Sequence, residues 1–194
     1  TLLSGIGMDP DEQKFYLTLA EILLKAGRFK DALDALNEMP EKEEVAAINY
    51  QKIRKYELLG HCEEGLGRYQ EAEGNTDRAL TLNPSSASAL NLKGILAFKQ
   101  NKAKAAEEFF KKAIKSDPGY GEPYTNLGTL KWEEGLEKDA LKLYEKGFMF
   151  TPTDLDIATI YHSTIGALGE FERAHSVVLD AAAMHPYNKK IQYL

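Results

Sequence analysis

The chain has 194 residues, of which 43% are hydrophobic and 28% are charged, a composition that is ordinary for a folded protein. Its formal net charge of −6 disfavours nucleic-acid binding, which usually requires a basic face. Its single cysteine, Cys62, excludes an intrachain disulfide, no apolar run approaches the length of a membrane span, and no signal peptide stands at its start. We therefore expect a cytoplasmic protein.

Proline recurs at a fixed interval through most of the chain. Pro84, Pro118, Pro152 and Pro186 are each 34 residues apart, and a period in this range is typical of a repeat protein. If proline is position 32 of a unit, the units begin at residues 53, 87, 121 and 155. Small residues then recur in the same phase, at position 8 (Gly60, Gly94, Gly128), position 20 (Ala72, Ala106, Ala140, Ala174) and position 27 (Ala79, Ala113, Gly147, Ala181).

This pattern predicts a pair of antiparallel helices in each unit. Positions 4, 7, 8 and 11 share one face of a first helix because they are three or four residues apart, and positions 20, 24 and 27 share one face of a second helix. Small side chains on these faces allow the two helix axes to approach closely. Glycine or asparagine at position 15 tolerates a positive φ and ends the first helix, and proline ends the second.

The repeated residues resemble the tetratricopeptide repeat family. The unit that begins at residue 53 contains the family pattern as Tyr56, Leu59, Gly60, Gly67, Tyr69, Ala72, Ala79 and Pro84. The unit that begins at residue 121 contains it as Tyr124, Leu127, Gly128, Gly135, Ala140, Tyr144 and Pro152. The resemblance covers about the whole chain and implies an all-α fold, an α-solenoid of antiparallel helix pairs with about four to five repeats of 34 residues.

In chain order, residues 1–12 match the end of a preceding unit, and residues 13–52 form an irregular repeat that is six residues too long. Regular repeats follow at 53–86, 87–120, 121–154 and 155–188, and residues 189–194 begin a further unit, all in one array. Neither end has an obvious polar cap, so we expect the native array to extend further. The predicted helices are 1–7, 11–25, 29–38, 43–66, 69–82, 86–100, 103–116, 120–134, 137–150, 154–168, 171–184 and 187–194.

The densest basic stretch falls on the predicted helix 103–116 and the residues before it. It contains Lys99, Lys102, Lys104, Lys111, Lys112 and Lys115. Glu107 and Glu108 interrupt it. We interpret the stretch as a solvated helix face and not as a nucleic-acid site.

In the family that the chain resembles, first helices line a concave groove, into which positions 2, 5, 9 and 12 point. In the irregular repeat 13–52, these positions hold Lys14, Leu17, Glu21 and Leu24. In the second half of the groove they are mostly small, polar and uncharged side chains, which suit hydrogen bonds to an extended peptide backbone, although exposed positions are often polar without any function: Ser88, Asn91, Thr125, Thr129, Thr159 and Ser163. The predicted ligand groove, with position 6 of one unit added, comprises Arg54, Glu57, His61, Ser88, Asn91, Ile95, Phe98, Glu122, Thr125, Asn126, Thr129, Trp132, Asp156, Thr159 and Ser163.

Phe98 and Trp132 leave two interpretations open. Tryptophan is frequent at binding hot spots, but the neighbouring position 11 lacks a large apolar side chain in both units, so either aromatic ring could fill the core instead. His162 replaces the small residue at position 8, where a packing adjustment is a better explanation than ligand binding. His61 and Cys62 have no second cysteine or paired histidine, so no zinc site is predicted.

Family members that clamp a terminal carboxylate use basic residues and asparagine at defined groove positions. This chain has Glu57, His61, Leu92, Glu122 and Asn126 there, so we reject such a clamp and expect a neutral or basic partner. Asn126 also resembles one rung of the asparagine ladder of glycosyl-transferring relatives, but Leu92 and Ile160 hold the equivalent positions.

No catalytic constellation, nucleotide fingerprint or cofactor motif is present in the sequence, so we do not expect an enzyme in this segment. The leading hypothesis is a protein–protein interaction scaffold that binds a peptide or a partner domain in the groove. The alternative is a substrate-recruiting segment of a larger enzyme, such as a glycosyltransferase. End-to-end self-association is a third possibility, because uncapped repeat arrays expose apolar surface.

Overall fold

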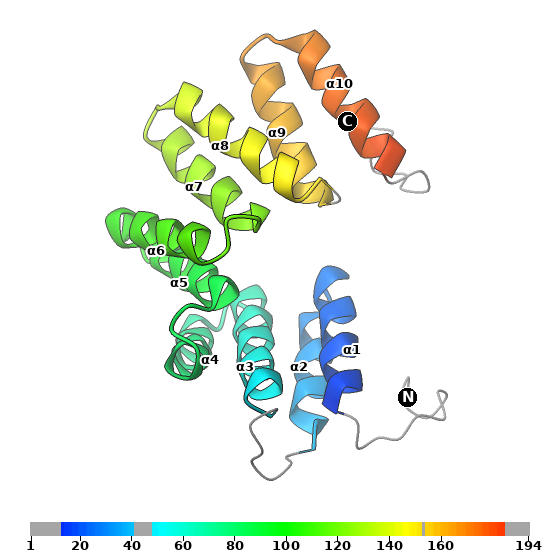
Figure 1. Cartoon of the computed structure of the whole chain (residues 1–194), viewed down its shortest axis with the longest axis vertical. Helices are drawn as coiled ribbons and strands as arrows, with labels where there is room; N and C mark the ends of the chain where they lie inside the picture. The colour runs from blue at the N-terminus through cyan, green and yellow to red at the C-terminus, as the bar shows by residue number, and fades with distance from the viewer. Residues whose placement is uncertain (1–12, 41–47, 153, 185–194) are drawn as a thin grey trace. The chain divides into compact units, whose positions relative to one another are not determined.

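The computed structural model describes residues 13–40, 48–152 and 154–184, which form helices and no strand (Figure 1). This confirms the predicted all-α fold. The predicted helices 1–7 and 187–194, and the first residues of the predicted helix 43–66, lie outside the described residues. The helices are α1 Gln13–Lys25, α2 Phe29–Glu38, α3 Ile48–Gly65, α4 Tyr69–Leu82, α5 Ala87–Lys99, α6 Ala103–Ser116, α7 Gly121–Glu133, α8 Glu137–Phe150, α9 Leu155–Ala167 and α10 Phe171–Met184.

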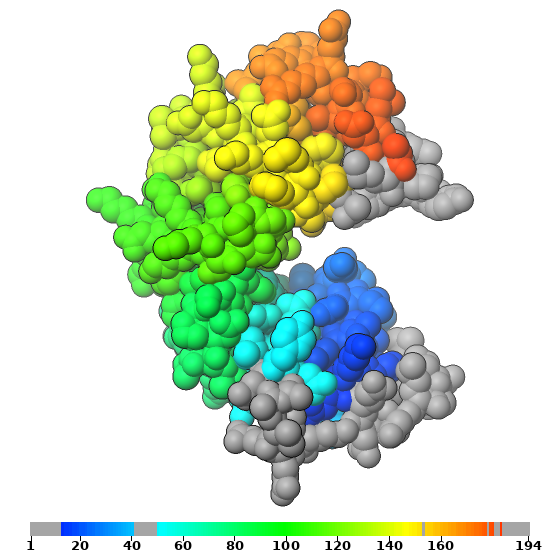
Figure 2. Space-filling model, in the orientation of Figure 1, coloured from blue at the N-terminus to red at the C-terminus, as the bar shows by residue number. Residues whose placement is uncertain are grey.

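The chain divides into two compact units between Leu96 and Ala97, within α5. In the first unit, α1 pairs with α2 and α3 pairs with α4, and α3 also packs against α1 and α2. In the second unit, α7 pairs with α8 and α9 with α10, while α6 packs on α7 and α8 packs on α9. The space-filling view shows these neighbouring helices in contact within each unit (Figure 2). None of the described helices is long and apolar enough to cross a membrane.

The first helix of each pair ends in the same way, at position 15. The residues there have a positive φ, from 58° at Asn101 to 80° at Gly169. At the first of these turns, the N–H of Arg28 donates to the carbonyl of Leu23 at 2.8 Å, and the N–H of Gly27 donates to that of Leu24 at 2.9 Å. This Schellman arrangement satisfies two helix-end carbonyls and requires a left-handed residue. The predicted role of position 15 is therefore confirmed.

The small residues at positions 8, 20 and 27 whose burial is described are all buried. Ala72, Ala106 and Ala140, all at position 20, are 0% exposed. At the crossing of α7 and α8, a Cβ atom added at Gly121 would lie 2.6 Å from the carbonyl oxygen of Gly147, at position 27. These positions face neighbouring helices and not solvent, as the repeat pattern predicts.

Candidate functional site

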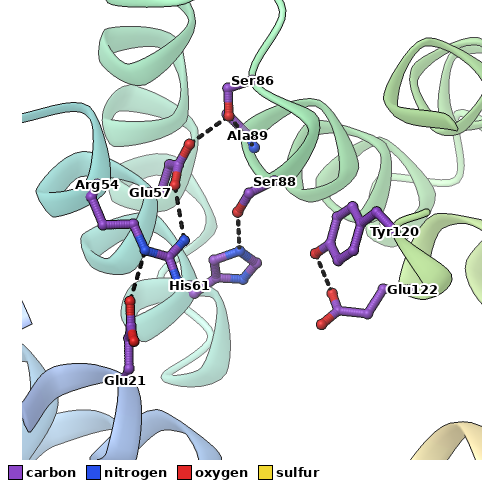
Figure 3. A network of polar contacts seen from close by, with 9 residues as sticks. All are labelled: Glu21, Arg54, Glu57, His61, Ser86, Ser88, Ala89, Tyr120 and Glu122. Carbon is purple, nitrogen blue, oxygen red and sulfur yellow. Dashed lines mark hydrogen bonds and ion pairs between the residues drawn. The ribbon is translucent and has the colours of Figure 1, made fainter. Parts of the chain in front are cut away.

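In the first unit, predicted groove residues on α3 form a chain of polar contacts with α1. The guanidinium of Arg54 lies between two carboxylates (Figure 3). Its Nε donates to Glu21 Oε1 at 2.9 Å, and its Nη1 donates to Glu57 Oε2 at 2.9 Å. Burial by itself would lower the pKa of Arg54, but the hydrogen bonds that it donates to Glu57 and Glu21 raise the pKa. Arg54 is therefore a permanent cation that two carboxylates neutralise internally.

Glu57 continues this chain of contacts to α5. Its carboxylate is buried, and its Oε1 accepts a hydrogen bond of 2.5 Å from the hydroxyl of Ser86. The same Ser86 oxygen accepts from the N–H of Ala89 at 3.1 Å, so Ser86 caps the N-terminus of α5. One carboxylate thus links α3 both to Arg54 and to the start of the next first helix. We call the set Glu21, Arg54, Glu57 and Ser86 the inner polar network.

His61 forms a second link between α3 and α5, one turn beyond Glu57. Its Nε2 lies 3.3 Å from the hydroxyl of Ser88, and the two side chains face each other (Figure 3). Burial, followed by the positive charge of Arg54, lowers the pKa of His61 to about 4. The imidazole is therefore neutral at physiological pH and can either donate to Ser88 or accept from it.

Cys62 belongs to the core and not to a reactive site. Its side chain is 0% exposed and packs in the cluster that also contains Leu23, Leu36 and Leu58. Burial, followed by the charge of Glu63, raises the pKa of the Cys62 thiol to about 12, so the nucleophilic and metal-binding thiolate is suppressed. Among the described residues, no group of three histidine, cysteine or acidic side chains could hold a metal ion.

Burial separates the predicted groove residues into two sets. Asn91 is 0% exposed, and Thr125 and Glu57 are at most 7% exposed. These three side chains support helix packing and are enclosed by the fold, so they are not available to a ligand in this conformation. The partly or fully exposed predicted residues are Arg54, His61, Ser88, Ile95, Phe98, Glu122, Asn126, Thr129, Trp132, Asp156, Thr159 and Ser163.

In the second unit, the threonines of α7 interact within their own helix pair. Thr125 lies at the α7–α8 crossing, where a Cβ atom added at Gly147 would come within 2.4 Å of its Oγ1. The hydroxyl of Thr129 donates to the carbonyl of Thr125 at 3.1 Å and accepts from the hydroxyl of Tyr144, on α8, at 3.3 Å. These hydroxyls therefore form hydrogen bonds within the α7–α8 pair, and fewer of their hydrogen-bonding groups remain for a ligand.

The hydroxyls of α9 are also satisfied locally. Thr159 donates to the carbonyl of Leu155 at 2.7 Å, and Ser163 donates to that of Thr159 at 2.7 Å. Such bonds to the preceding turn use the hydroxyl proton and leave only oxygen lone pairs for a partner. Asp156 lies in the first turn of α9 and is exposed. This face of α9 thus presents acceptors and one carboxylate, which suits a donor-rich partner.

The remaining predicted residues are partly exposed. Glu122 accepts from the hydroxyl of Tyr120 through its Oε2 at 2.5 Å (Figure 3). Asn126 follows one turn later on α7. Trp132 packs against the cluster that contains Tyr144 and Tyr161. This packing favours the core interpretation for Trp132.

Ser86, Tyr120 and Tyr144 take part in these contacts but were absent from the predicted site. Ser86 had a local signal, since a serine two residues after Pro84 and just before a helix is a typical N-cap. Tyr144 lies at position 24, which the repeat assigns to the core. A tyrosine can bury its ring and still direct its hydroxyl to a polar partner, and here the hydroxyl donates to Thr129 Oγ1.

Comparisons with known proteins agree with this geometry. One tetratricopeptide repeat family model matches residues 2–54, and a second matches residues 58–121. The chain belongs to the tetratricopeptide repeat family. The predicted resemblance is therefore confirmed.

Solved tetratricopeptide structures share the fold. The APC/C hetero-tetramer Cut9–Hcn1 aligns over 95% of this chain and 36% of its own, with a TM-score of 0.68 and 18% sequence identity. TTC0263, a thermophilic TPR protein of Thermus thermophilus, aligns over 81% of this chain and 83% of its own, with a TM-score of 0.63 and 22% identity. At these identities the likeness extends to the fold alone, a helical solenoid.

Two curated relatives are named as members of complexes. Anaphase-promoting complex subunit 7 of Arabidopsis thaliana is 30% identical over 133 residues, which cover 68% of this chain and 22% of the relative. BBSome complex member BBS4 of Bos taurus is 26% identical over 156 residues, which cover 80% of this chain and 29% of the relative. The tetratricopeptide chain thus spans less than a third of the length of either relative.

Proposed function

We propose that this tetratricopeptide chain is a protein-interaction module that binds a neutral or basic peptide segment of a partner protein on positions 2, 5, 9 and 12 of its first helices, which we call the groove face. The observation that carries the proposal is the exposure and hydrogen bonding of the polar side chains on the groove face of α9. There, exposed Asp156 and Ser163 lie two turns apart beside partly exposed Thr159, and the hydroxyl protons are already used within the helix. Acceptors without competing donors favour peptide N–H groups and cationic side chains.

Charge supports the same partner class. Glu122 and Asp156 lie at position 2 of their repeats, and the cation at position 2 of the first regular repeat, Arg54, is neutralised by Glu21 and Glu57. On α3, α7 and α9, a terminal carboxylate or a phosphate would meet these acidic groups without an unpaired cation at position 2, whereas Lys14, at position 2 of α1, is an exposed cation. An acidic ligand is therefore disfavoured on the groove face of α3, α7 and α9.

The family relationship favours a scaffold over an enzyme segment. Both curated relatives are named as members of multi-protein complexes. We infer that this chain likewise contributes a binding surface to an assembly. The alternative, a recruiting segment attached to a catalytic domain, predicts a glycosyltransferase or other catalytic fold in the same polypeptide, and the full-length gene product distinguishes the two.

The experiment selects peptides on the purified chain from a random displayed library and measures their dissociation constants by fluorescence anisotropy. The groove-face variant is Asp156→Lys with Ser163→Lys. The matched control is Asp180→Lys with Ser176→Lys, which makes the same changes at exposed positions of α10. We expect the groove-face pair to weaken binding by about tenfold or more and the control pair by about twofold or less, because like charges repel a cationic peptide only at the contact site.

Circular dichroism melts of both variants establish that the helices remain folded. Equal weakening by the two pairs, or a larger effect of the α10 pair, would contradict the groove-face proposal. Selection of acidic peptides in place of neutral or basic ones would contradict the assigned partner chemistry.

A further inference from the structure

Helix α6 differs in charge from every other second helix in the described part of the chain. Within its bounds, α6 has four lysines and two glutamates. The corresponding helices α2, α4 and α10 each have more acidic than basic residues, and in α8 the two kinds are equal. A local excess of positive charge therefore stands within a chain whose net charge is −6.

One of the two glutamates that interrupt the basic sequence of α6 is neutralised by ion pairs with lysines. The carboxylate of Glu107 turns sideways toward α7, where its Oε1 lies 3.1 Å from the ammonium nitrogen of Lys131. The same oxygen lies 2.8 Å from that of Lys111. The side chain of Glu107 is only 24% exposed, whereas that of Lys111 is 62% exposed. The ammonium groups lower the pKa of Glu107 through hydrogen bonds, Lys111 first and Lys131 second, so this carboxylate stays ionised and is occupied by two cations.

The outward stripe of α6 consists of Lys104, Lys111 and Lys115, with Glu108 as its one carboxylate. The lysines are seven and four residues apart, so they lie on one face of the helix. All three are exposed, and among the described residues neither Lys104 nor Lys115 forms an ion pair. We call these three residues the lysine stripe. From Lys104 to Lys115 the helix rises by about 16 Å.

Lys112 borders the lysine stripe and extends its positive charge. Its ammonium nitrogen lies 5.2 Å from the centroid of the Phe109 ring, a cation–π distance that holds the side chain near the helix. Lys99 and Lys102 precede the helix and are also exposed. Exposed lysines therefore extend from the last residue of α5 to the last turn of α6.

We propose that the lysine stripe is a docking site for an acidic segment of a protein, separate from the groove face of the first helices. A length of about 16 Å corresponds to about five residues of extended chain. Because the lysines are about 10 Å and then about 6 Å apart along the helix, carboxylates spaced by about three and then two residues along such a segment would come opposite the three ammonium groups. This inference does not rest on the proposed peptide site of α9.

Protein acids fit this surface better than nucleic acid does. A DNA duplex carries a charge about every 1.7 Å and extends far beyond a stripe of three lysines, so it would be repelled by the acidic remainder of the chain. The stripe also lacks arginine, the side chain that binds phosphate with two parallel hydrogen bonds. A short acidic peptide matches both the number and the extent of the cations.

The test measures binding of a fluorescent peptide of six glutamates by anisotropy, with six glutamines as the control peptide. The variant is Lys104→Glu with Lys115→Glu, and the matched control is Lys138→Glu with Lys142→Glu, at exposed positions of α8. We expect hexaglutamate to bind and the glutamine peptide not to bind. The α6 pair should weaken hexaglutamate binding about tenfold at 50 mM salt, and the α8 pair about threefold or less, because only nearby charges act strongly at this screening length.

Raising the salt concentration should weaken binding to the unaltered protein and leave little difference between the two variants. An equal effect of the α6 and α8 pairs would overturn the proposal, since it would show a response to net charge alone. Tighter binding of a short DNA duplex, or of vesicles containing phosphatidylserine, than of hexaglutamate would overturn the assignment to a protein segment. Unchanged circular dichroism melts ensure that a loss of binding is not a loss of fold.

Discussion

The two units use the same repeat positions for different contacts. In the first unit, positions 2, 5 and 9 of the repeat that begins at residue 53 hold Arg54, Glu57 and His61, which contact α1 and α5. In the second unit, Thr125 and Thr129, at positions 5 and 9, contact their own helix pair. Equivalent positions therefore join neighbouring repeats in one unit and stabilise a single repeat in the other.

This difference shows how a repeat protein can vary the strength of the contacts between its repeats without altering its fold. The stability of such a protein is approximately the sum of the stability within repeats and that of the interfaces between them. Charged side chains are long enough to bridge between first helices, whereas threonine reaches only its own helix or the helix beside it. The inner polar network should therefore strengthen interfaces, and the α7–α8 crossing should strengthen one repeat.

The largest effect should follow from Gly121→Ala, which breaks the contact within a repeat. The added Cβ would lie 2.6 Å from the backbone carbonyl oxygen of Gly147 and 2.9 Å from Thr151 Cβ. A backbone atom cannot relieve this clash by a change of rotamer, as a side chain could. We expect the free energy of unfolding to fall by about 3 kcal/mol, measured by urea denaturation. Gly74→Ala is the matched control, because its Cβ would meet no atom within 4 Å and alanine favours a helix. A loss as large at Gly74 would refute the crossing as the cause.

A drop in pH should lower the free energy of unfolding of the first unit because His61 becomes protonated. The pKa of this side chain is about 4 in the fold, against an ordinary value of 6.5, so the unfolded state binds more protons between these values. The stability is fully present above about pH 7 and declines as the pH falls through 6.5 toward 4. Because the imidazole is partly exposed, we expect a loss of about 2 kcal/mol from this group by pH 4.

The measurement compares urea denaturation of the unaltered protein and of His61→Gln at several pH values from 7.5 to 4. The variant should lack this part of the pH dependence, while His175→Gln, at an exposed position of α10, should retain it. Parallel curves for the unaltered protein and His61→Gln would show that His61 is not the group responsible.

Replacing Glu57 by glutamine should weaken the interface between α3 and α5 more moderately. The amide keeps one acceptor but loses the charge that faces Arg54, while Glu21 still pairs with that guanidinium. We expect a loss of about 1 kcal/mol in urea denaturation. In a double-mutant cycle, Glu57→Gln and Ser86→Ala should be less than additive, because both alter the same 2.5 Å hydrogen bond. Full additivity would mean that the two side chains act independently.

Sequence reasoning located the helices and the close helix contacts because each depends on a local rule. A glycine or asparagine at position 15 is required by a left-handed helix end, as Gly67 and Asn101 illustrate. An alanine at position 20, such as Ala72, is required by a close helix crossing. These rules need no knowledge of which partner lies opposite, so a repeat pattern is sufficient.

The candidate site was predicted less well because a repeat pattern gives the average exposure of a position and not its partner. Position 5 was expected to face a groove, but Glu57 is buried and accepts a hydrogen bond from Ser86, which lies 29 residues later at the N-terminus of α5. Asn91, at the same position of the next repeat, is also enclosed. Such pairings between repeats depend on side-chain length and on the neighbouring residue, and neither follows from the period.

The smallest effect should follow from Thr159→Ala, which tests position 5 once more in the second unit. The hydroxyl of Thr159 donates to the carbonyl of Leu155, in the preceding turn of the same helix. Removing it leaves a helical carbonyl that still accepts from the backbone, and alanine has a higher helix propensity. We expect the free energy of unfolding to change by less than about 0.5 kcal/mol. A loss similar to that of Glu57→Gln would show that Thr159 also stabilises an interface between repeats, and the contrast between the two units would then depend on individual residues and not on the unit.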